Sequence, residues 1–322
     1  MYLSNPELPF VLKGYKGNTY KKGRFVNDSG TFPPSLFQVL KWKLSKNPQQ
    51  AEKERDTFKP DIITGTDFVS ETRDHIAWLG HASFYIRFNG KVFITDPCFY
   101  DLPLIKRNQH LPCPAKDIDN VDYLLLSHAH RDHFDRKSYE EIVKSNPNLK
   151  ALIPLKAASL LKDRIHYQEA GWYQKFSICK EVEVIFLPAN HWSKRGLLDL
   201  NNMLWGSFLL KSGDKTIYFA GDTSTSKHFK TIAEIFGPID YCLMPIGAYK
   251  PSSLMQPSHL SPTEAISAFN DLRGNTFIPM HYGTYDLSDE PMGEPVRTIY
   301  ENKNKINGDL KIPKIGEVLP IS

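Results

Sequence analysis

The chain has 322 residues, of which 41% are hydrophobic and 24% charged, an ordinary balance for a globular protein with one large core or two smaller ones. No run approaches the roughly 20 uninterrupted apolar residues of a transmembrane helix, and the N-terminus lacks a signal-peptide pattern, so a cytoplasmic protein is expected. The cysteines Cys98, Cys113, Cys179 and Cys242 form no C-x-x-C pair, which argues against a zinc ribbon or a thioredoxin-like motif.

The net charge of +4 is unevenly distributed along the chain. Residues 1–60 contain 11 Lys and Arg against 5 Asp and Glu, giving +6, so the remainder carries −2. This basic segment is either a solvated arm or a surface that meets anionic phospholipid headgroups. Nucleic acid is not expected as a partner, because the segment contains no recognisable nucleic-acid-binding motif.

Residues 1–70 are expected to form a basic N-terminal arm that packs on the body, which comprises residues 71–322. Within the arm, a Pro-Pro-Ser sequence precedes a predicted helix over 36–44. One face of that helix would be apolar, and its members are Leu36, Phe37, Leu40 and Leu44. The sequence leaves open whether this face docks on the body or lies on a membrane.

From about residue 75 the apolar positions become regular. Asn89-Gly90 is a typical hairpin turn, and Ser261 to Glu264 form a capping box that opens a helix reaching about Leu272. A second helix is predicted over 138–143. The predicted strands cover 75–79, 83–88, 91–95, 121–126, 182–187, 216–220, 241–246 and 276–280.

Four of these strands end next to a His or Asp. The strands ending at Leu126, Leu187, Ala220 and Met280 are followed closely by such side chains. Loops at strand ends are the usual place for functional residues on a rigid sheet. The alternation of strands and helices in two halves predicts a sandwich of two mixed sheets with helices outside.

The densest group of potential metal ligands is the run from His128 to His133. It places His128, His130, Asp132 and His133 within six residues, directly after a buried strand. Imidazole and carboxylate ligands suit zinc, iron, manganese or nickel, and the lack of thiolates argues against a purely structural zinc site. The isolated histidines are interpreted as structural or surface residues, and these are His75, His110, His166 and His228.

The H-x-H-x-D-H run, a later His, the Asp of Gly221-Asp222-Thr223 and a late His resemble the metallo-β-lactamase superfamily. The resemblance implies an α/β fold, a four-layer αββα sandwich, with a hydrolase domain over 71–322 and a binuclear metal site. It assigns one metal to His128, His130 and His191, and the other to Asp132, His133 and His281. Asp222 would bridge the two metals, and Asp96 would support the loop of residues 128–133, called the ligand loop below.

A narrower resemblance is carried by further segments. Residues 78–83 (WLGHAS), 191–195 (HWSKR), 219–223 (FAGDT), 245–249 (PIGAY) and 256–265 (QPSHLSPTEA) resemble phospholipases D that hydrolyse N-acylphosphatidylethanolamine. Two departures, Tyr282 where tryptophan is expected and Ser258 before His259, would alter the substrate cavity. The resemblance implies hydrolysis of such lipids to N-acylethanolamine and phosphatidic acid.

The implied mechanism uses two divalent ions, with Zn²⁺ favoured and Mn²⁺ or Fe²⁺ as alternatives, and a hydroxide that bridges them and attacks phosphorus. The implied catalytic residues are Asp132, Asp222 and His259. His259 is expected at the phosphate or the leaving oxygen, with a locally satisfied histidine at a helix start as the alternative. His81 would fix the tautomer of a ligand, or be a core histidine. Substrate contacts are expected from Lys194, Arg195, His259 and Tyr282, although the two basic residues could also be solvated loop charges.

Two other functions remain open from the sequence. One is a soluble metal-dependent lactonase or small-ester hydrolase, similar to the ascorbate phosphate lactonases. The other is a non-enzymatic sensor on the same fold, which the complete set of ligands disfavours. The expected partners are a phospholipid or a small anionic ester, with peripheral contact at the inner membrane face through the basic arm, and relatives suggest a homodimer.

Overall fold

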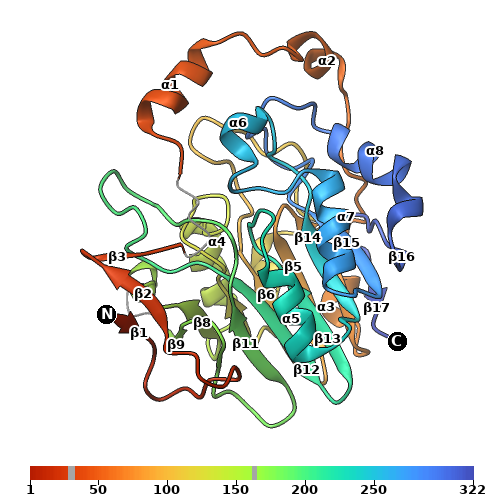
Figure 1. Cartoon of the computed structure of the whole chain (residues 1–322). Coiled ribbons are helices and arrows are strands. Elements are labelled where there is room, and N and C mark those ends of the chain that lie inside the picture. Colours follow the sequence, from red (N-terminus) through yellow and green to blue (C-terminus); the bar gives the residue numbers. More distant parts are fainter. Residues whose placement is uncertain (28–32, 162–164) are drawn as a thin grey trace.

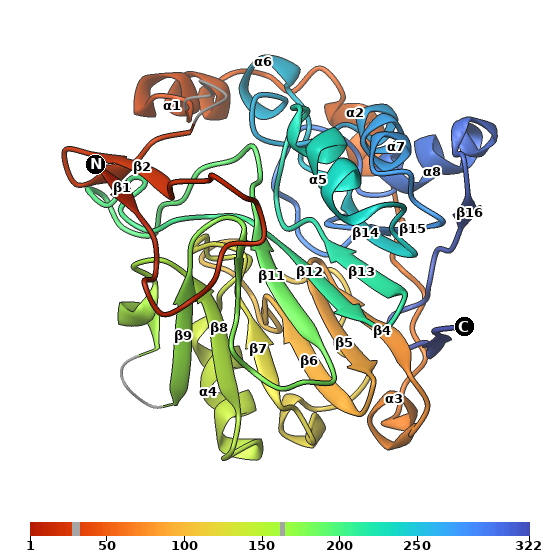
Figure 2. The ribbon, with the colours of Figure 1, turned by 60° about the horizontal axis from the view of Figure 1, so that its bottom comes forward.

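The computed structural model describes residues 1–27, 33–161 and 165–322, and it has the expected sandwich architecture. Two seven-stranded sheets pack face to face, and helices cover their outer faces (Figures 1 and 2). The first sheet has the order β17 (Leu319–Pro320), β4 (His75–Gly80), β5 (Ser83–Phe88), β6 (Lys91–Thr95), β7 (Tyr123–Leu125), β8 (Lys150–Pro154) and β9 (His166–Ala170). The second has the order β10 (Gln174–Lys175), β11 (Glu183–Leu187), β12 (Ser207–Ser212), β13 (Lys215–Phe219), β14 (Tyr241–Pro245), β15 (Thr276–Met280) and β16 (Asp309–Leu310).

Both sheets combine antiparallel hairpins with parallel strands. Strands β4 to β6 and β10 to β13 are antiparallel, whereas β6 to β9 and β13 to β16 run parallel. Parallel neighbours need a crossover connection, and α8 (Glu294–Glu301) lies in the one between β15 and β16, while three other helices lie in connections between further parallel pairs. These are α4 (Arg136–Ser145) between β7 and β8, α5 (His228–Phe236) between β13 and β14, and α7 (Pro262–Asp271) between β14 and β15.

The main core lies between the two sheets. Along β4, Ile76 and Trp78 face this core, while Ala77 and Leu79 face a second cluster beneath α4. Side chains alternate between the faces of a strand, and both faces are covered here, so the strand is apolar at nearly every position. Such burial on both sides fixes the register of the sheet and therefore the positions of the loops at its edge.

Most predicted element positions are confirmed. The strands over 83–88, 91–95 and 276–280 have the expected bounds, and the helix at Ser261 has its capping box. The strand predicted over 121–126 is shorter, at Tyr123–Leu125, although flanking backbone bonds from Asp122 and Leu126 continue its pairing. Strands β8, β9 and β12 and helices α5 and α8 (Glu294–Glu301) were not predicted.

The described parts of the first 70 residues, 1–27 and 33–70, form short elements of their own. They contain a small sheet of β1 (Tyr2–Leu3), β2 (Asn18–Lys21) and β3 (Arg24–Phe25), then α1 (Leu36–Leu44), α2 (Gln50–Arg55) and α3 (Asp67–Ser70). Asn5 donates from Nδ2 to the carbonyl of Glu169 at 2.8 Å, and the Phe25 N–H donates to Asn201 at 2.7 Å. None of the helices in the described part of the chain combines the length and hydrophobicity that a membrane crossing requires.

Helix α1 has the predicted bounds, and Ser35 begins it with a capping box. Its predicted apolar face does not dock on the body, because Phe37, Leu40 and Leu44 are 75%, 55% and 80% exposed. The half-buried positions among its described side chains are Val39 and Trp42. The short helix α6 (Ser252–Met255) lies at the same edge of the sandwich (Figure 1).

Candidate metal centre

The expected ligand residues meet at one edge of the sandwich. Asp96 and His281 directly follow β6 and β15, and the histidine run begins three residues after β7. His281 has a φ of +62° and Asp96 a φ of +34°, so the chain turns sharply as it leaves each strand. The approach is close, since a Cβ added at Gly247 would lie 2.1 Å from the His281 carbonyl oxygen. Packing at this edge therefore fixes the backbone that carries the ligands.

Three imidazole rings converge on one point. His130 Nδ1 lies 2.8 Å from His128 Nε2 and 3.2 Å from His191 Nε2. The Nδ1–H of His191 donates to the Ser258 carbonyl at 2.9 Å, which leaves a lone pair on its Nε2. Ser127 Oγ donates to Asp96, so it accepts from the Nδ1–H of His128, whose Nε2 likewise carries a lone pair.

These three nitrogens cannot satisfy one another by hydrogen bonds. His130 can offer at most one proton from Nδ1, whereas two lone pairs point at that atom. A divalent cation at the shared point would satisfy all three, because the ring nitrogens are arranged as in zinc sites of histidine ligands. The residues present therefore fit a metal ion.

A second group lies beside the first and shares Asp222 with it. Asp222 Oδ1 is 3.1 Å from His281 Nε2, and Asp222 Oδ2 is 3.2 Å from His133 Nε2 and 3.7 Å from His191 Nε2. Asp132 Oδ2 is 3.5 Å from His281 Nε2. The structure thus brings together all seven predicted ligands, in clusters whose potential ligand atoms lie within 4.8 Å of one another.

The second group requires positive charge. Burial lowers the pKa of His281, but the carboxylates of Asp222 and Asp132 outweigh this effect and raise the pKa to about 9. Burial alone would raise the pKa of Asp222, yet the surrounding histidines, with His133 foremost, hold that pKa well below its usual range. Two buried carboxylates facing ring nitrogens are a suitable environment for a divalent cation.

Asp96 supports the ligand loop through hydrogen bonds to Ser127 and His133. The carboxylate is fully buried, and it accepts hydrogen bonds from the backbone N–H of Ser127 at 2.7 Å and from His133 Nδ1 at 2.6 Å. The second bond keeps the proton of His133 on Nδ1 and directs its Nε2 toward Asp222 and Asp132.

His81 approaches the same oxygen of Asp132 as His281 does. Its Nε2 is 3.1 Å from Asp132 Oδ2, and its ring centroid is 4.0 Å from that of His281. Burial, together with the neighbouring His281, lowers the pKa of His81 to about 3. A neutral ring in this position donates from Nε2 to the Asp132 carboxylate and so orients it.

His259 borders the shared carboxylate at the start of the segment leading to α7. Its Nδ1 is 3.7 Å from Asp222 Oδ2, and burial lowers its pKa to about 4. Its side chain is 15% exposed, because it lines the pocket that opens over the cluster. His259 is therefore available to a bound molecule, unlike the more deeply buried His133 and His281.

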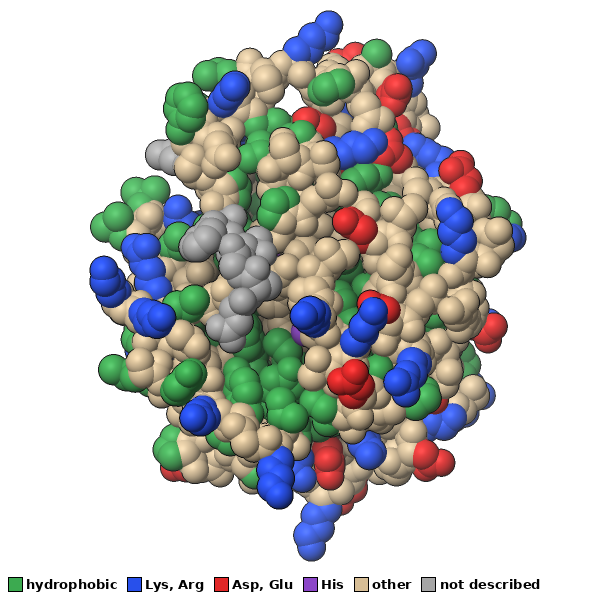
Figure 3. Space-filling model, viewed as in Figure 1, with side chains coloured by type: hydrophobic (Ala, Val, Ile, Leu, Met, Phe, Trp, Pro, Cys, Tyr) green, Lys and Arg blue, Asp and Glu red, His purple; other side chains and the backbone are tan. Residues whose placement is uncertain are grey.

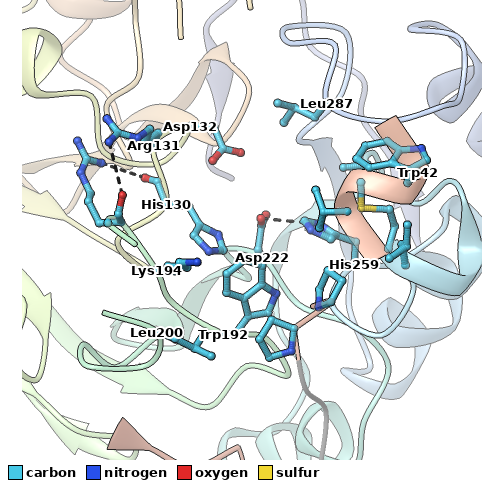
Figure 4. Close-up of a pocket in the computed structure, with 18 residues that line it drawn as sticks. Trp42, His130, Arg131, Asp132, Trp192, Lys194, Leu200, Asp222, His259 and Leu287 are labelled. Carbon is cyan, nitrogen blue, oxygen red and sulfur yellow. Dashed lines mark hydrogen bonds and ion pairs between the residues drawn. The ribbon is translucent and has the colours of Figure 1, made fainter. Parts of the chain in front are cut away.

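The pocket has a volume of about 500 Å³. Figure 4 shows Asp222 and His259 at its centre, Lys194 and His130 to one side, and Trp42 and Leu287 to the other. The apolar wall contains residues that sequence reasoning did not single out as site residues, and these are Val39, Trp42, Leu254, Met255 and Leu287. Only the fold brings these distant segments together.

Arg195 and Tyr282, two of the residues predicted to contact substrate, make their main contacts with other parts of the protein. Arg195 borders the pocket, but its guanidinium donates to the backbone carbonyls of Phe134 at 2.5 Å and of Ala129 and His130 at 3.4 Å. It therefore holds the ligand loop. Tyr282 is 4% exposed and stacks on Trp78 with ring centroids 5.0 Å apart, so it lies in the core rather than in the pocket wall.

Comparison with known proteins identifies the family. A sequence profile of the beta-lactamase superfamily domain matches residues 92–282. The chain is 33% identical over 285 residues to the N-acyl-phosphatidylethanolamine-hydrolyzing phospholipase D 1 of Caenorhabditis elegans, covering 82% of this chain and 80% of that one. It is 30% identical over 234 residues to a metal-dependent hydrolase of Pyrococcus abyssi, covering 72% and 94% of the two chains.

Solved structures share the fold. The structure of a possible metal-dependent hydrolase from Veillonella parvula has a TM-score of 0.62 at 16% sequence identity, and the match covers 78% of this chain and all of that one. The profile alone spans more than half of the present chain, and the His and Asp clusters lie at the expected strand ends. The chain therefore belongs to the metallo-β-lactamase superfamily and is one of its metal-dependent hydrolases.

Proposed function

We propose that this protein is a phosphodiesterase of the phospholipase D type, with two divalent ions in its centre, that hydrolyses N-acylphosphatidylethanolamine-like lipids. The observation that carries the proposal is the composition of the pocket. One part is formed by the cluster members that line the pocket together with Lys194, and the other part by apolar side chains such as Trp42 and Leu287; the cluster members are His130, Asp132, Asp222 and His259. A substrate with a phosphate beside a hydrocarbon chain matches both parts. The name of the Caenorhabditis elegans relative supports the same substrate class.

Divalent ions bound at these clusters would supply a hydroxide nucleophile at neutral pH and Lewis-acid stabilisation of phosphoryl charge. The protein residues prepare the site. Asp222 faces both ligand groups, with Oδ1 near His281 and Oδ2 near His191, and Asp132 is oriented by His81. His259, with a pKa lowered to about 4 by burial, is a neutral ring that can hydrogen bond to a phosphoryl oxygen or the leaving oxygen.

The reaction class is tested with a substrate panel. Wild type and His259→Gln are assayed on N-acylphosphatidylethanolamine in mixed micelles, on water-soluble phosphodiesters and on small lactones. We expect wild type to release N-acylethanolamine and phosphatidic acid, and His259→Gln to lose about 10²-fold in kcat while metal content is unchanged. Turnover of lactones without any phosphodiester cleavage would replace this function by a lactonase, and unchanged kcat in the variant would remove His259 from catalysis.

Lys194 and Arg195 are expected to have separable effects. Lys194 lines the pocket and can receive an anionic group, whereas the guanidinium of Arg195 is occupied by backbone carbonyls of the ligand loop. Lys194→Gln should raise KM about tenfold, the effect of losing one charged hydrogen bond, without changing metal content. Arg195→Gln should instead lower the Tm and the metal content of the purified protein. Equal increases in KM in Lys194→Gln and Arg195→Gln would contradict these separate roles of the two residues.

Peripheral contact with an anionic membrane is part of the proposal. The exposed apolar residues Phe37, Leu40 and Leu44 lie on α1 among lysines, and no Asp or Glu occurs between residues 33 and 51. The space-filling view shows apolar and basic side chains near one another in the region of α1 (Figure 3). Basic residues near an anionic surface each contribute about 1 kcal/mol, and exposed apolar side chains can enter the interfacial layer. Because the electrostatic part is screened by salt, activity on vesicles should decrease as ionic strength rises.

A further inference from the structure

Helix α1 touches the rest of the protein with a different face from the one its sequence favours. Among its described side chains, Val39 and Trp42 are half-buried, and both line the pocket over the metal centre. The other large apolar residues of α1 whose side chains are described, Phe37, Leu40 and Leu44, are 75%, 55% and 80% exposed. A helix that served only to stabilise the fold would bury its largest apolar surface. The position of α1 is therefore better explained by what Val39 and Trp42 do in the pocket.

Polar contacts hold Trp42 in this position. Its indole Nε1–H donates to Asp289 Oδ1 at 2.9 Å, and Asn47 Nδ2 donates to the Asp289 carbonyl at 2.8 Å. Lys53, in α2, forms an ion pair with Asp286. These bonds fasten α1 and α2 to the segment that follows β15, outside the matched family domain at both ends. The indole ring is thus fixed as part of the pocket wall.

The apolar wall continues on α6 and reaches the catalytic residues. Leu254 and Met255 line the same pocket, and the Met255 carbonyl accepts the backbone N–H of His259 at 2.9 Å. Leu287 completes the wall beside Trp42, as Figure 4 shows. A molecule that bound its anionic group near Asp222 and His259 would therefore place an attached hydrocarbon chain against Trp42.

We propose that α1 supplies a subsite for the hydrocarbon chain of the substrate and that Trp42 determines selectivity for long chains. The inference rests on the proposed function only in placing the reacting group at the metal centre. The ligand class is an anionic ester or phosphodiester that carries a long acyl or alkyl chain. Removing the indole ring would take away a large apolar contact that a short substrate never makes.

The test compares two residues on opposite faces of one helix. Trp42→Ala removes the pocket contact, and Phe37→Ala removes an exposed ring from the same helix. Each variant is assayed with p-nitrophenyl phosphodiesters that bear a methyl or a dodecyl group, and with γ-butyrolactone and γ-dodecalactone. All substrates are kept below their micelle concentrations, so membrane contact plays no part. Trp42→Phe retains a ring but loses the bond to Asp289, and it should preserve most of the selectivity.

We expect Trp42→Ala to lower the ratio of kcat/KM for the long substrate to that for the short one by about 10- to 100-fold, as for lost contacts in other apolar pockets. In Trp42→Ala the short-substrate kcat/KM should fall much less than the long-substrate value and the metal content should stay at the wild-type value, and Phe37→Ala should match wild type throughout. An unchanged ratio in Trp42→Ala, or an equal fall in both alanine variants, overturns the inference. If only lactones are cleaved but the ratio still falls, the phosphodiesterase function fails and the chain subsite stands.

Discussion

Replacing Asp222 with asparagine is expected to lower hydrolysis by at least about 10³-fold, the upper end of the loss seen when one group that stabilises charge in a transition state is removed. The two Asp222 oxygens face the two ligand groups, with Oδ1 3.1 Å from His281 Nε2 in one and Oδ2 3.7 Å from His191 Nε2 in the other. Asparagine has the same shape but only one acceptor oxygen, and its amide N–H would point at one of these sites. The shared negative ligand would be lost while the packing is kept.

The measurement for Asp222→Asn is the initial rate together with the metal content of the purified protein. The matched control is Asp214→Asn, because Asp214 is exposed in the turn between β12 and β13, at the opposite end of β13 from Asp222. That control should keep both its rate and its metal. A fully active Asp222→Asn protein with normal metal content would show that the centre does not depend on this carboxylate.

The second large effect, on metal affinity, is expected from Asp96→Asn, although Asp96 is not among the residues that line the pocket over the metal centre. The Asp96 carboxylate accepts from Ser127 N–H at 2.7 Å and from His133 Nδ1 at 2.6 Å. If the asparagine oxygen keeps the bond to Ser127, its amide N–H₂ group faces the Nδ1–H of His133. His133 would then relieve the clash by moving its proton to Nε2, the atom that faces Asp222.

The predicted result for Asp96→Asn is a 10- to 100-fold loss of metal affinity, the usual effect of removing a carboxylate that orients a histidine ligand. Titration of the metal-free protein with Zn²⁺, followed by activity at saturating Zn²⁺, would separate affinity from turnover. Asp122→Asn is the control, since Asp122 accepts the backbone N–H of Val92 at the opposite end of β6. Equal affinities in the two variants would contradict the role of Asp96.

The grouping of the candidate ligands could be predicted from the sequence because their spacing is local. His128 to His133 lie within one loop, and each remaining ligand follows an apolar strand at a short distance. Once the strands are recognised, their ends are expected at one edge, because parallel strands of a sheet end on the same side. Helix starts were equally accessible, since the capping side chains of Ser35 and Ser261 bond to residues three positions along the chain.

The unpredicted elements show the limit of local patterns. Strand β8 is a short apolar run, and such a run does not distinguish a strand from a buried piece of helix by periodicity. Helix α5 begins at Lys227 without a side-chain cap, so its start carries no local signal. Whether each of these segments forms a strand or a helix depends on its packing against the rest of the sandwich.

Only the tertiary structure decided what surrounds the ligands. Lys194 and Arg195 are adjacent, similar in charge and both at the pocket, yet the guanidinium of Arg195 donates to backbone carbonyls. Tyr282 directly follows the ligand His281, but its ring turns into the core against Trp78. On α1, Trp42 rather than the more obvious apolar face meets the pocket. The sequence determined which side chains can bind metal, because that depends on ligand chemistry and short spacing. The fold decided which residues meet a substrate, because that depends on contacts between segments far apart in the chain.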